Sequence, residues 1–306
     1  MRRQFLAAGL ALFSSIMAVA LAHPIQSSNM IQISHQINRL YVFGDSLSDV
    51  GNVYHASGKI YPPNPPYFQG RYSNGLVWVE YLSSKLALTP EQNANFAYGG
   101  ATTGNGSVNG IPGLLAQVQA FTKVHQEVNP NALYVLWAGA NDYLYGGANP
   151  TLTASNISKA MESLSKMGAK KILVVNLPDL GKVPATRTSA NSTTLSSFAI
   201  AHNQTLVKSV EELKQELGSD TQIEILDVYS LYQEATKYPS RFGLTNVTNA
   251  CSNNLAICDN PEKYLFWDGI HPTTVAHRVI AEAAFKVIKT EFSFSATTPQ
   301  ALRGHL

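Results

Sequence analysis

Short apolar runs and longer stretches of helical periodicity alternate along most of the 306-residue chain. The apolar runs, rich in β-branched and aromatic residues, predict strands over residues 40–43, 132–138, 171–176 and 223–228, with a weaker candidate over residues 95–98. Apolar positions three and four apart predict helices over residues 111–127, 153–167, 195–217 and 273–290. Because strands that alternate with long helices need crossover connections, this order predicts a three-layer α/β/α sandwich with a mostly parallel central sheet.

Two segments depart from this alternation. Residues 61–67 (YPPNPPY) are rich in proline, which fixes the backbone angle φ, and they predict an ordered insertion. Residues 239–259 are polar and irregular, and they predict the longest loop of the chain. Neither segment has the composition of a linker that would divide the chain into separate domains.

The first 22 residues have the pattern of a secretory signal peptide. Arg2 and Arg3 give a positive start, residues 5–19 are almost entirely apolar, and residues 20–22 (ALA) form a small-x-small cleavage site. An uncleaved membrane anchor is the alternative, but the apolar run is near the lower limit for a membrane span. The sequence therefore predicts removal of residues 1–22 and a secreted or periplasmic protein with one domain over residues 23–306.

The net charge of the mature chain argues against nucleic acid and anionic membranes as partners. Loss of Arg2 and Arg3 lowers the number of basic residues from 22 to 20, equal to the 20 acidic residues, all of which follow the cleavage site. A chain without net charge is not expected to bind nucleic acid, and it should contact a membrane surface only transiently.

The two cysteines, Cys251 and Cys258, lie close together within the predicted long loop. In an exported protein such a pair most simply forms a local disulfide, which would stabilise the fold by roughly 2–3 kcal/mol. Metal binding is a poor alternative, because no set of cysteines or histidines surrounds the pair. The bridged loop, only ten positions before Asp268, is either a simple staple or a lid over a nearby site.

Polar clusters follow three of the predicted strands, at residues 44–46 (GDS), 99–102 (GGAT) and 139–142 (GAND), and a fourth, at residues 267–272 (WDGIHP), opens the last predicted helix. Ligands of open α/β sheets gather at such strand ends. A serine hydroxyl becomes a nucleophile when a base and a group that orients the base lie beside it.

We expect Ser46 to be that nucleophile, His271 its base and Asp268 the acid that orients the base. The backbone N–H groups of Ser46 and Gly100 and the side-chain amide of Asn141 are the donors that an oxyanion hole needs. The sequence thus predicts an enzyme of acyl transfer.

These blocks, in this order, resemble those of the GDSL, or SGNH-hydrolase, family: GDSL at 44–47, GGAT at 99–102, GAND at 139–142 and DGIHP at 268–272. The resemblance extends over about residues 40–288. Carried over residue by residue, it implies the same nucleophile, oxyanion donors, acid and base. A G-x-S-x-G elbow is missing from the sequence, which disfavours an ordinary α/β-hydrolase.

Four longer stretches are similar to those of bacterial secreted lipolytic members of the family, among them phospholipases A, lysophospholipases A and glycerophospholipid:cholesterol acyltransferases. They are GDSLSDVGN (44–52), GRYSNGLVWVEYL (70–82), NFAYGGATT (95–103) and NLPDLGKVP (176–184). The resemblance implies hydrolysis of lipid or lysophospholipid acyl esters without a cofactor, with transfer to an alcohol such as a sterol as a further activity. A secreted carbohydrate acetyl esterase and a non-catalytic binding protein are the alternatives.

Other polar residues near these motifs have simpler interpretations. Asp45 is expected to shape the turn at Ser46, and Asp142 to bond nearby backbone. His125, His202 and His277 lie in predicted helices, where packing is the simpler role, and their spacing does not suggest a metal site. Aromatic residues in and after the proline-rich segment can either line an acyl-chain groove or pack that segment: Tyr61, Tyr67, Phe68, Tyr72 and Trp78.

Overall fold

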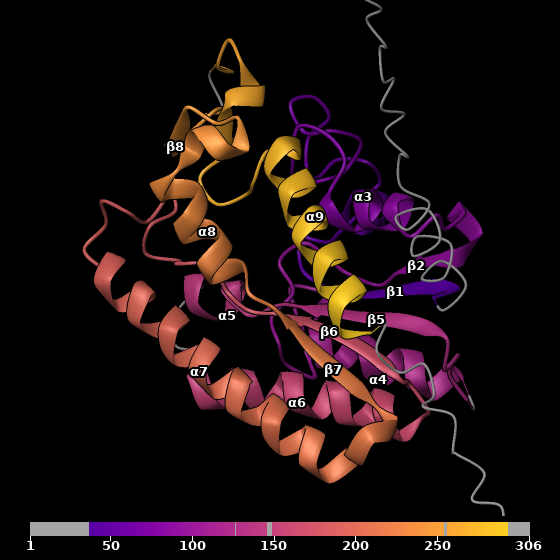
Figure 1. The fold of residues 1–306 in the computed structure, drawn as a ribbon. Coiled ribbons are helices and arrows are strands. Elements are labelled where there is room, and N and C mark those ends of the chain that lie inside the picture. The colour runs from indigo at the N-terminus through magenta and orange to yellow at the C-terminus, as the bar shows by residue number, and fades with distance from the viewer. Residues whose placement is uncertain (1–36, 126, 146–148, 254–255, 293–306) are drawn as a thin grey trace, which may run out of the picture.

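Five parallel strands form the centre of the structure (Figure 1), a computed structural model that describes residues 37–125, 127–145, 149–253 and 256–292. In order across the sheet they are β2 (Asn93–Asn95), β1 (Arg39–Gly44), β5 (Ala132–Trp137), β6 (Lys171–Val175) and β7 (Gln222–Leu226). β1 pairs with β5 along its whole length, so that Gly44 lies opposite Trp137 and the two strands end together. The predicted signal peptide, residues 1–22, lies outside the described residues.

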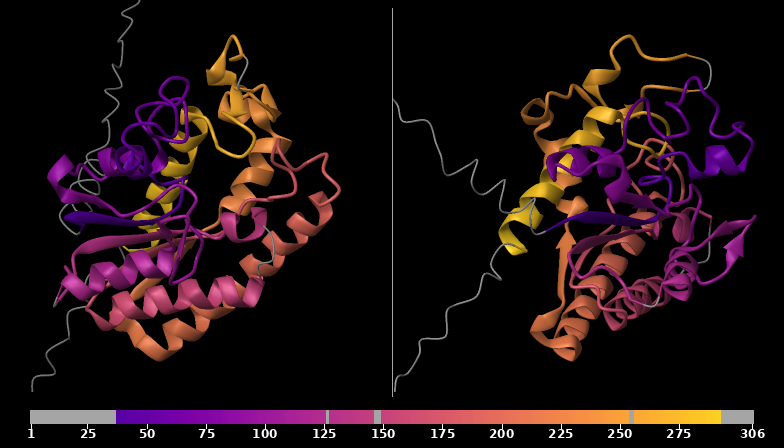
Figure 2. Two further views of the ribbon diagram at one scale, coloured as in Figure 1. Left: turned by 180° about the vertical axis from the view of Figure 1, so that it is seen from behind. Right: turned by 90° about the vertical axis from the view of Figure 1, so that its right-hand side faces the viewer.

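Helices cover both faces of the sheet, as Figures 1 and 2 show. One face carries α4 (Leu114–Val124), α6 (Pro150–Lys166) and α7 (Ser192–Leu217). The other carries α3 (Trp78–Lys85) and α9 (Thr274–Glu291), and α8 (Val228–Lys237) follows β7. The predicted three-layer α/β/α sandwich is therefore confirmed.

Shorter elements connect these layers. They are the helices α2 (Asn52–Ala56) and α5 (Ala140–Leu144), the hairpin of β3 (Ser107–Val108) and β4 (Ile111–Pro112), the pair of β8 (Asn246–Ala250) and β9 (Tyr264–Phe266), and the 3₁₀ turns η1 (Pro90–Gln92), η2 (Gly218–Asp220), η3 (Pro239–Phe242) and η4 (Pro261–Lys263). Within the described ranges, no helix combines the length and the apolar content that crossing a bilayer requires.

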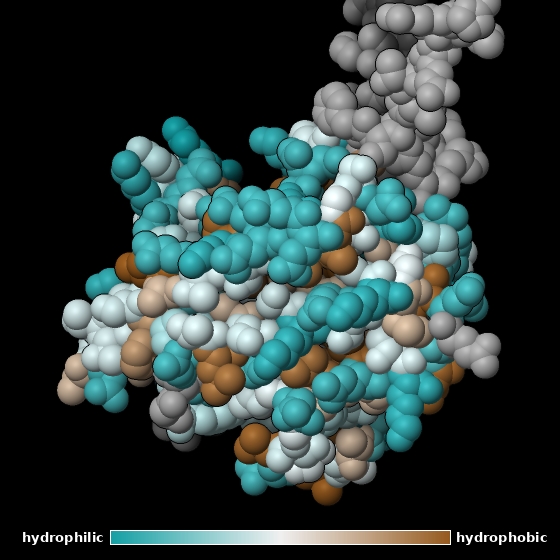
Figure 3. Space-filling model, turned by 90° about the horizontal axis from the view of Figure 1, so that it is seen from below, coloured by the Kyte–Doolittle hydropathy of each residue, from teal (hydrophilic) through white to brown (hydrophobic). Residues whose placement is uncertain are grey.

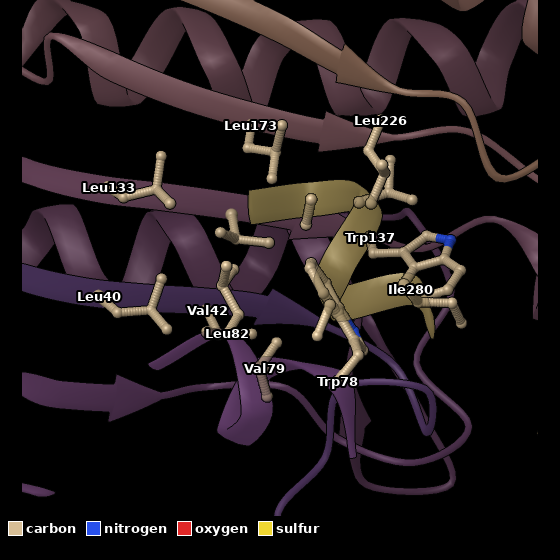
Figure 4. Packing of buried hydrophobic residues seen from close by; sticks show 14 of the residues in the cluster. Leu40, Val42, Trp78, Val79, Leu82, Leu133, Trp137, Leu173, Leu226 and Ile280 are labelled. Carbon is tan, nitrogen blue, oxygen red and sulfur yellow. The ribbon is translucent and has the colours of Figure 1, made fainter. Parts of the chain in front are cut away.

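The core consists of two apolar layers, one on each face of the sheet. All six side chains of β5 are buried, because helices cover this central strand on both sides. In the layer of Figure 4, the rings of Trp78 and Trp137 meet edge to face with their centroids 5.5 Å apart. Burial of each large apolar side chain contributes about 1.5–3 kcal/mol, so this layer fixes α3 and α9 on the sheet.

The outer surface of the molecule is more polar than this core. The face seen from below in Figure 3 carries mostly hydrophilic and intermediate side chains, with hydrophobic ones scattered among them. On α6 and α7, the large apolar side chains that remain exposed are Leu152, Ile200 and Val207. Scattered apolar residues of this kind are normal on a protein surface and do not indicate a binding face.

The predicted elements differ from the structure in several places, and the loop predicted over residues 239–259 contains η3 and β8. The helix predicted from residue 111 begins at Leu114, because residues 111–112 pair with residues 107–108 in the hairpin. Strand β2 ends at Asn95, where the weak candidate began, although Phe96 and Tyr98 still donate backbone hydrogen bonds to β1. Helices α3 and α8 were not predicted, and both are short.

Candidate active site

Three side chains from two distant segments of the chain meet at the carboxyl edge of the sheet. The Ser46 hydroxyl lies 2.8 Å from Nε2 of His271, which is 225 positions later in the sequence. Nδ1 of the same ring lies 2.7 Å from Oδ2 of Asp268. Ser46 and His271 are each only 8% exposed. The side chains that the sequence analysis proposes as nucleophile, base and orienting acid therefore lie within hydrogen-bond distance of one another.

The turn that carries Ser46 depends on a glycine in front of it. A side chain at Gly44 would place its Cβ 2.3 Å from the carbonyl oxygen of Trp137, so only glycine lets β1 end this close to β5. Gln117 then clamps Gly44, accepting its N–H and donating to its carbonyl. The Asp45 carboxylate accepts the N–H of Leu47, which turns the chain sharply after the strand.

Asp49 joins this turn to the second motif. Its buried carboxylate accepts the N–H groups of Gly51, Asn52 and Val53 at the start of α2. It also accepts the N–H of Gly99, at a distance of 2.9 Å. The bond to Gly99 joins residues 50 positions apart, and no local pattern in the sequence predicts it.

The two later oxyanion candidates are fastened to each other. Asn141, in the first turn of α5, donates one amide N–H to the carbonyl of Ala101, directly after Gly100. The neighbouring Asp142 accepts the backbone N–H and the hydroxyl of Thr103, as expected for a residue that bonds nearby backbone. Gly100 has a φ of +85°, a conformation that other residues rarely adopt. Asn141 keeps a second amide hydrogen that can be donated to an oxyanion.

Asp268 has four hydrogen-bond donors around it. Oδ1 accepts the backbone N–H groups of Ile270 and His271, whereas Oδ2 lies against the His271 ring and the Tyr67 hydroxyl. Burial favours the protonated acid, but the facing His271 ring and these donors outweigh it and lower the pKa of Asp268 to about 2. An ionised Asp268 requires Nδ1 of His271 to carry the hydrogen, which leaves the Nε2 lone pair for the Ser46 hydroxyl.

Comparison with known proteins places the chain in a family. The profile of GDSL-like lipases and acylhydrolases matches residues 40–284. The chain belongs to this family. It is therefore a hydrolase of the esterase and lipase class, as the sequence motifs indicate.

Two relatives and one solved structure illustrate the likeness. The phosphatidylcholine-sterol acyltransferase of Aeromonas hydrophila is 31% identical over 317 residues, which cover 85% of this chain and 92% of that protein. The secreted effector protein SseJ of Salmonella typhimurium is 34% identical over 80% of this chain, and the match spans 62% of its own length. A lipolytic G-D-S-L family protein from Veillonella parvula superposes with a TM-score of 0.51 at 16% identity, covering 82% of this chain and 98% of that one, which shows the common fold alone.

A GDSL-like acylhydrolase must hold an acyl group beside its serine, and an apolar cavity adjoins Ser46 and His271. Its walls come from β9, α8, α9 and the segment after β6, and they include Leu180, Val228, Leu231, Ala235, Phe266 and Ile280. None of the aromatic residues considered from the sequence for an acyl-chain groove is part of this lining. Tyr72 instead packs against His271, with the two ring centroids 5.1 Å apart.

Sequence reasoning missed the helix that forms one wall of the cavity. Val228, Leu231, Tyr232 and Ala235 of α8 all line it. They occupy positions i, i+3, i+4 and i+7, a spacing that predicts an amphipathic helix. The signal was therefore present, within a helix of only ten residues.

The cysteine-bearing loop lies next to the turn that carries Asp268 and His271. Cys251 and Cys258 form a disulfide, as expected. The Cys251 N–H bonds to the carbonyl of Phe266, and the Ser252 N–H to that of Trp267, the residue before Asp268. The loop is thus attached to the strand that leads into the Asp268–His271 turn.

Two further histidines are buried in the acylhydrolase and have no place in the reacting set. Burial lowers the pKa of His202 to about 4 and that of His277, near His271, to about 3. His202 faces the hydroxyls of Tyr143 and Thr153, whereas Nδ1 of His277 accepts the backbone N–H of Trp78. Both contacts agree with the packing role expected from the sequence.

Proposed function

We propose that this acylhydrolase acts on lipids, as a phospholipase A or lysophospholipase A that can also transfer the acyl group to an alcohol such as a sterol. The apolar cavity beside Ser46 and His271 carries this proposal. Each methylene group of a fatty acyl chain that enters it is removed from water, a gain of about 0.8 kcal/mol. An acetyl group would leave most of the cavity empty, so the cavity favours lipids over acetylated polysaccharides.

The proposed reaction uses the residues of the site in two steps. The Ser46 oxygen attacks the ester carbonyl while Nε2 of His271 accepts its proton, and the charge on the carbonyl oxygen is received by the N–H groups of Ser46, Gly100 and Asn141. Collapse of this intermediate breaks the bond to the leaving alkoxide, which takes the proton from His271. Water, or an acceptor alcohol, then attacks the acyl-enzyme carbonyl while His271 takes its proton. The bond to the Ser46 oxygen breaks, and His271 returns the proton to Ser46.

The relatives support two finer points of the proposal. The Aeromonas protein is named for acyl transfer from phosphatidylcholine to a sterol, which supports a sterol as the acceptor here. The Salmonella protein is named as secreted, which supports export of this chain. Removal of residues 1–22 and one catalytic domain over residues 23–306 are part of the proposal.

The test is a substrate series with the products identified. Esters of one alcohol with acyl chains of increasing length should show kcat/KM rising about fourfold for each methylene that enters the cavity, and then a plateau. Mixed phospholipids and lysophospholipids should release fatty acid, and added sterol should yield sterol ester. The Ser46→Ala variant serves as the blank. An enzyme that prefers acetyl esters and releases no fatty acid from either lipid would instead be the carbohydrate esterase considered from the sequence.

A further inference from the structure

The proline-rich segment reaches the catalytic acid directly. The Tyr67 hydroxyl donates a hydrogen bond of 2.6 Å to Oδ2 of Asp268, 201 positions later in the chain. The same oxygen accepts the Nδ1–H of His271. Oδ1 of the carboxylate has two backbone donors of its own, so the Tyr67 hydroxyl and the His271 ring are the two groups that hold Oδ2.

The segment over residues 61–72, here called the proline-rich strap, is anchored at both ends. At its start, the Ser57 hydroxyl oxygen accepts the N–H of Tyr61. At its end, Arg71 forms a two-point ion pair with Glu80 at the start of α3, with N–O distances of 2.7 and 3.3 Å. Four prolines between these anchors restrict the backbone further, so the strap presents the Tyr67 hydroxyl from a fixed position.

Aromatic contacts complete the cover over the acid–base pair. The Tyr67 ring meets Trp267 nearly at right angles, with centroids 6.5 Å apart, and meets Tyr72 at 6.3 Å. The Tyr72 ring in turn lies against His271. These rings exclude water from one side of Asp268, and a hydrogen bond to a charged group is stronger where water is excluded.

We propose that Tyr67 is a positioning residue of this active site: its hydroxyl holds the Asp268 carboxylate in the orientation that aims the His271 ring at Ser46. The proposal rests on the proposed ester hydrolysis by Ser46, but it is independent of the identity of the lipid. Without the hydroxyl, Oδ2 keeps only the His271 ring as a partner. The carboxylate is then held by the two hydrogen bonds to Oδ1 and by this ring, and it can change its orientation.

The test is the Tyr67→Phe variant on a short water-soluble ester such as p-nitrophenyl butyrate, which needs no lipid surface. Loss of a hydrogen bond to a charged group should lower kcat about 10- to 100-fold with KM nearly unchanged. The acid limb of the kcat/KM profile should also move to higher pH. Its direction follows because the Tyr67 hydrogen bond lowers the pKa of Asp268, so that without this bond the carboxylate becomes protonated at a higher pH.

Other titratable groups near the pair stay in place in this variant. Tyr61 interacts electrostatically with Asp268 without a hydrogen bond to it, Asp45 and His277 interact with His271, and Asp142 interacts with Asp45. Tyr61→Phe is the matched control, because it removes a hydroxyl from the same strap without removing a bond to Asp268. It should keep the wild-type kcat and pH profile.

Three results would overturn the proposal. The first is an unchanged kcat and pH profile in Tyr67→Phe. The second is a fall in kcat that comes with a lower melting temperature and an unmoved acid limb, since that pattern belongs to a structural role. The third is an equal effect of Tyr61→Phe, which would assign the loss to the strap as a whole. Ester hydrolysis that survives Ser46→Ala would reject the proposed catalytic set itself, a separate and recognisable failure.

Discussion

The active site has two halves that are built differently. The nucleophile half consists of the turns after β1, β2 and β5, over residues 44–49, 99–103 and 139–142. These three strands are neighbours in the central sheet, and their turns bond directly to one another. The acid–base half, residues 267–272, follows β9, which pairs with β8 outside that sheet.

The difference lies in what fixes the geometry of each half. The order of strands in the sheet brings the parts of the nucleophile half together, so the fold itself determines their positions. The acid–base half is held by contacts from distant segments: Tyr67 bonds Asp268, the Ser73 hydroxyl donates to Pro272, and Ser252 bonds Trp267. We therefore expect changes in the strap and the disulfide loop to act on the acid–base half alone.

The largest expected effect comes from the nucleophile half. Ser46→Ala should lower kcat on any ester on the order of 10⁶-fold, because no other group in the described site can form the acyl-enzyme. Its folding should be unaffected, since the bonds of the turn are made by Gly44, Asp45 and Asp49 rather than by the serine. Ester hydrolysis and thermal unfolding measure the two expectations. Retained turnover would show that Ser46 is not the nucleophile.

Asn141→Ala should have the next largest effect. Loss of one oxyanion donor should lower kcat about 100- to 1000-fold while KM and the pH profile stay close to wild type. Asn156→Ala is the control, because the Asn156 amide bonds the same turn at the Thr103 hydroxyl without being a candidate oxyanion donor. A pH profile that moved in Asn141→Ala would show that the two halves are coupled.

The difference between the nucleophile half and the acid–base half also explains which parts of the site the sequence could predict. Strong apolar runs predicted β1, β5, β6 and β7, and the turns that follow strands had recognisable polar motifs. Ser46, Gly100 and Asn141 could therefore be placed before the structure, because strand order and strand ends decide where they lie. Asp268 and His271 were found through a short motif, in which they lie three positions apart, rather than through an element of the sheet.

The supports of the acid–base half could not be predicted in this way. The bond from Tyr67 to Asp268 joins residues 201 positions apart, and no local periodicity encodes such a contact. The cavity was missed for a different reason. The apolar spacing of α8, which forms one of its walls, is visible in the sequence, but the helix has only ten residues. Periodicity predicts elements, whereas side-chain contacts between insertions depend on tertiary packing.

The disulfide loop offers a smaller test of the acid–base half. The double variant Cys251→Ser, Cys258→Ser should lower the free energy of unfolding by roughly 2–3 kcal/mol, because the ring no longer restricts the unfolded chain. Urea unfolding measures this loss. If the loop is only a staple, the ratio of kcat/KM between long-chain and short-chain esters should stay constant. A changed ratio would favour the lid considered from the sequence.

The smallest expected effect concerns a buried histidine beneath each half. His202 packs below α5 on the nucleophile side, and His277 lies on α9 behind the acid–base side. Their pKa values in the fold, about 4 and about 3, are below the ordinary value of 6.5. Only the unfolded chain therefore binds these protons as pH falls below 6.5, so stability falls in that range, on the order of 1 kcal/mol per pH unit for each histidine.

Asp45 has the opposite effect on the pH dependence of stability, so the contribution of each histidine must be measured against wild type. Burial raises its pKa to about 7, so the fold binds its proton before the unfolded chain does, and its contribution to stability grows as pH falls from 7 toward 4. The readout is therefore a difference between proteins. Urea unfolding at pH 7 and pH 5 should show a smaller loss of stability in His202→Gln, and in His277→Gln, than in wild type. If one variant kept the full wild-type loss, that histidine would not be buried in its neutral form, and the packing of its half would need to be revised.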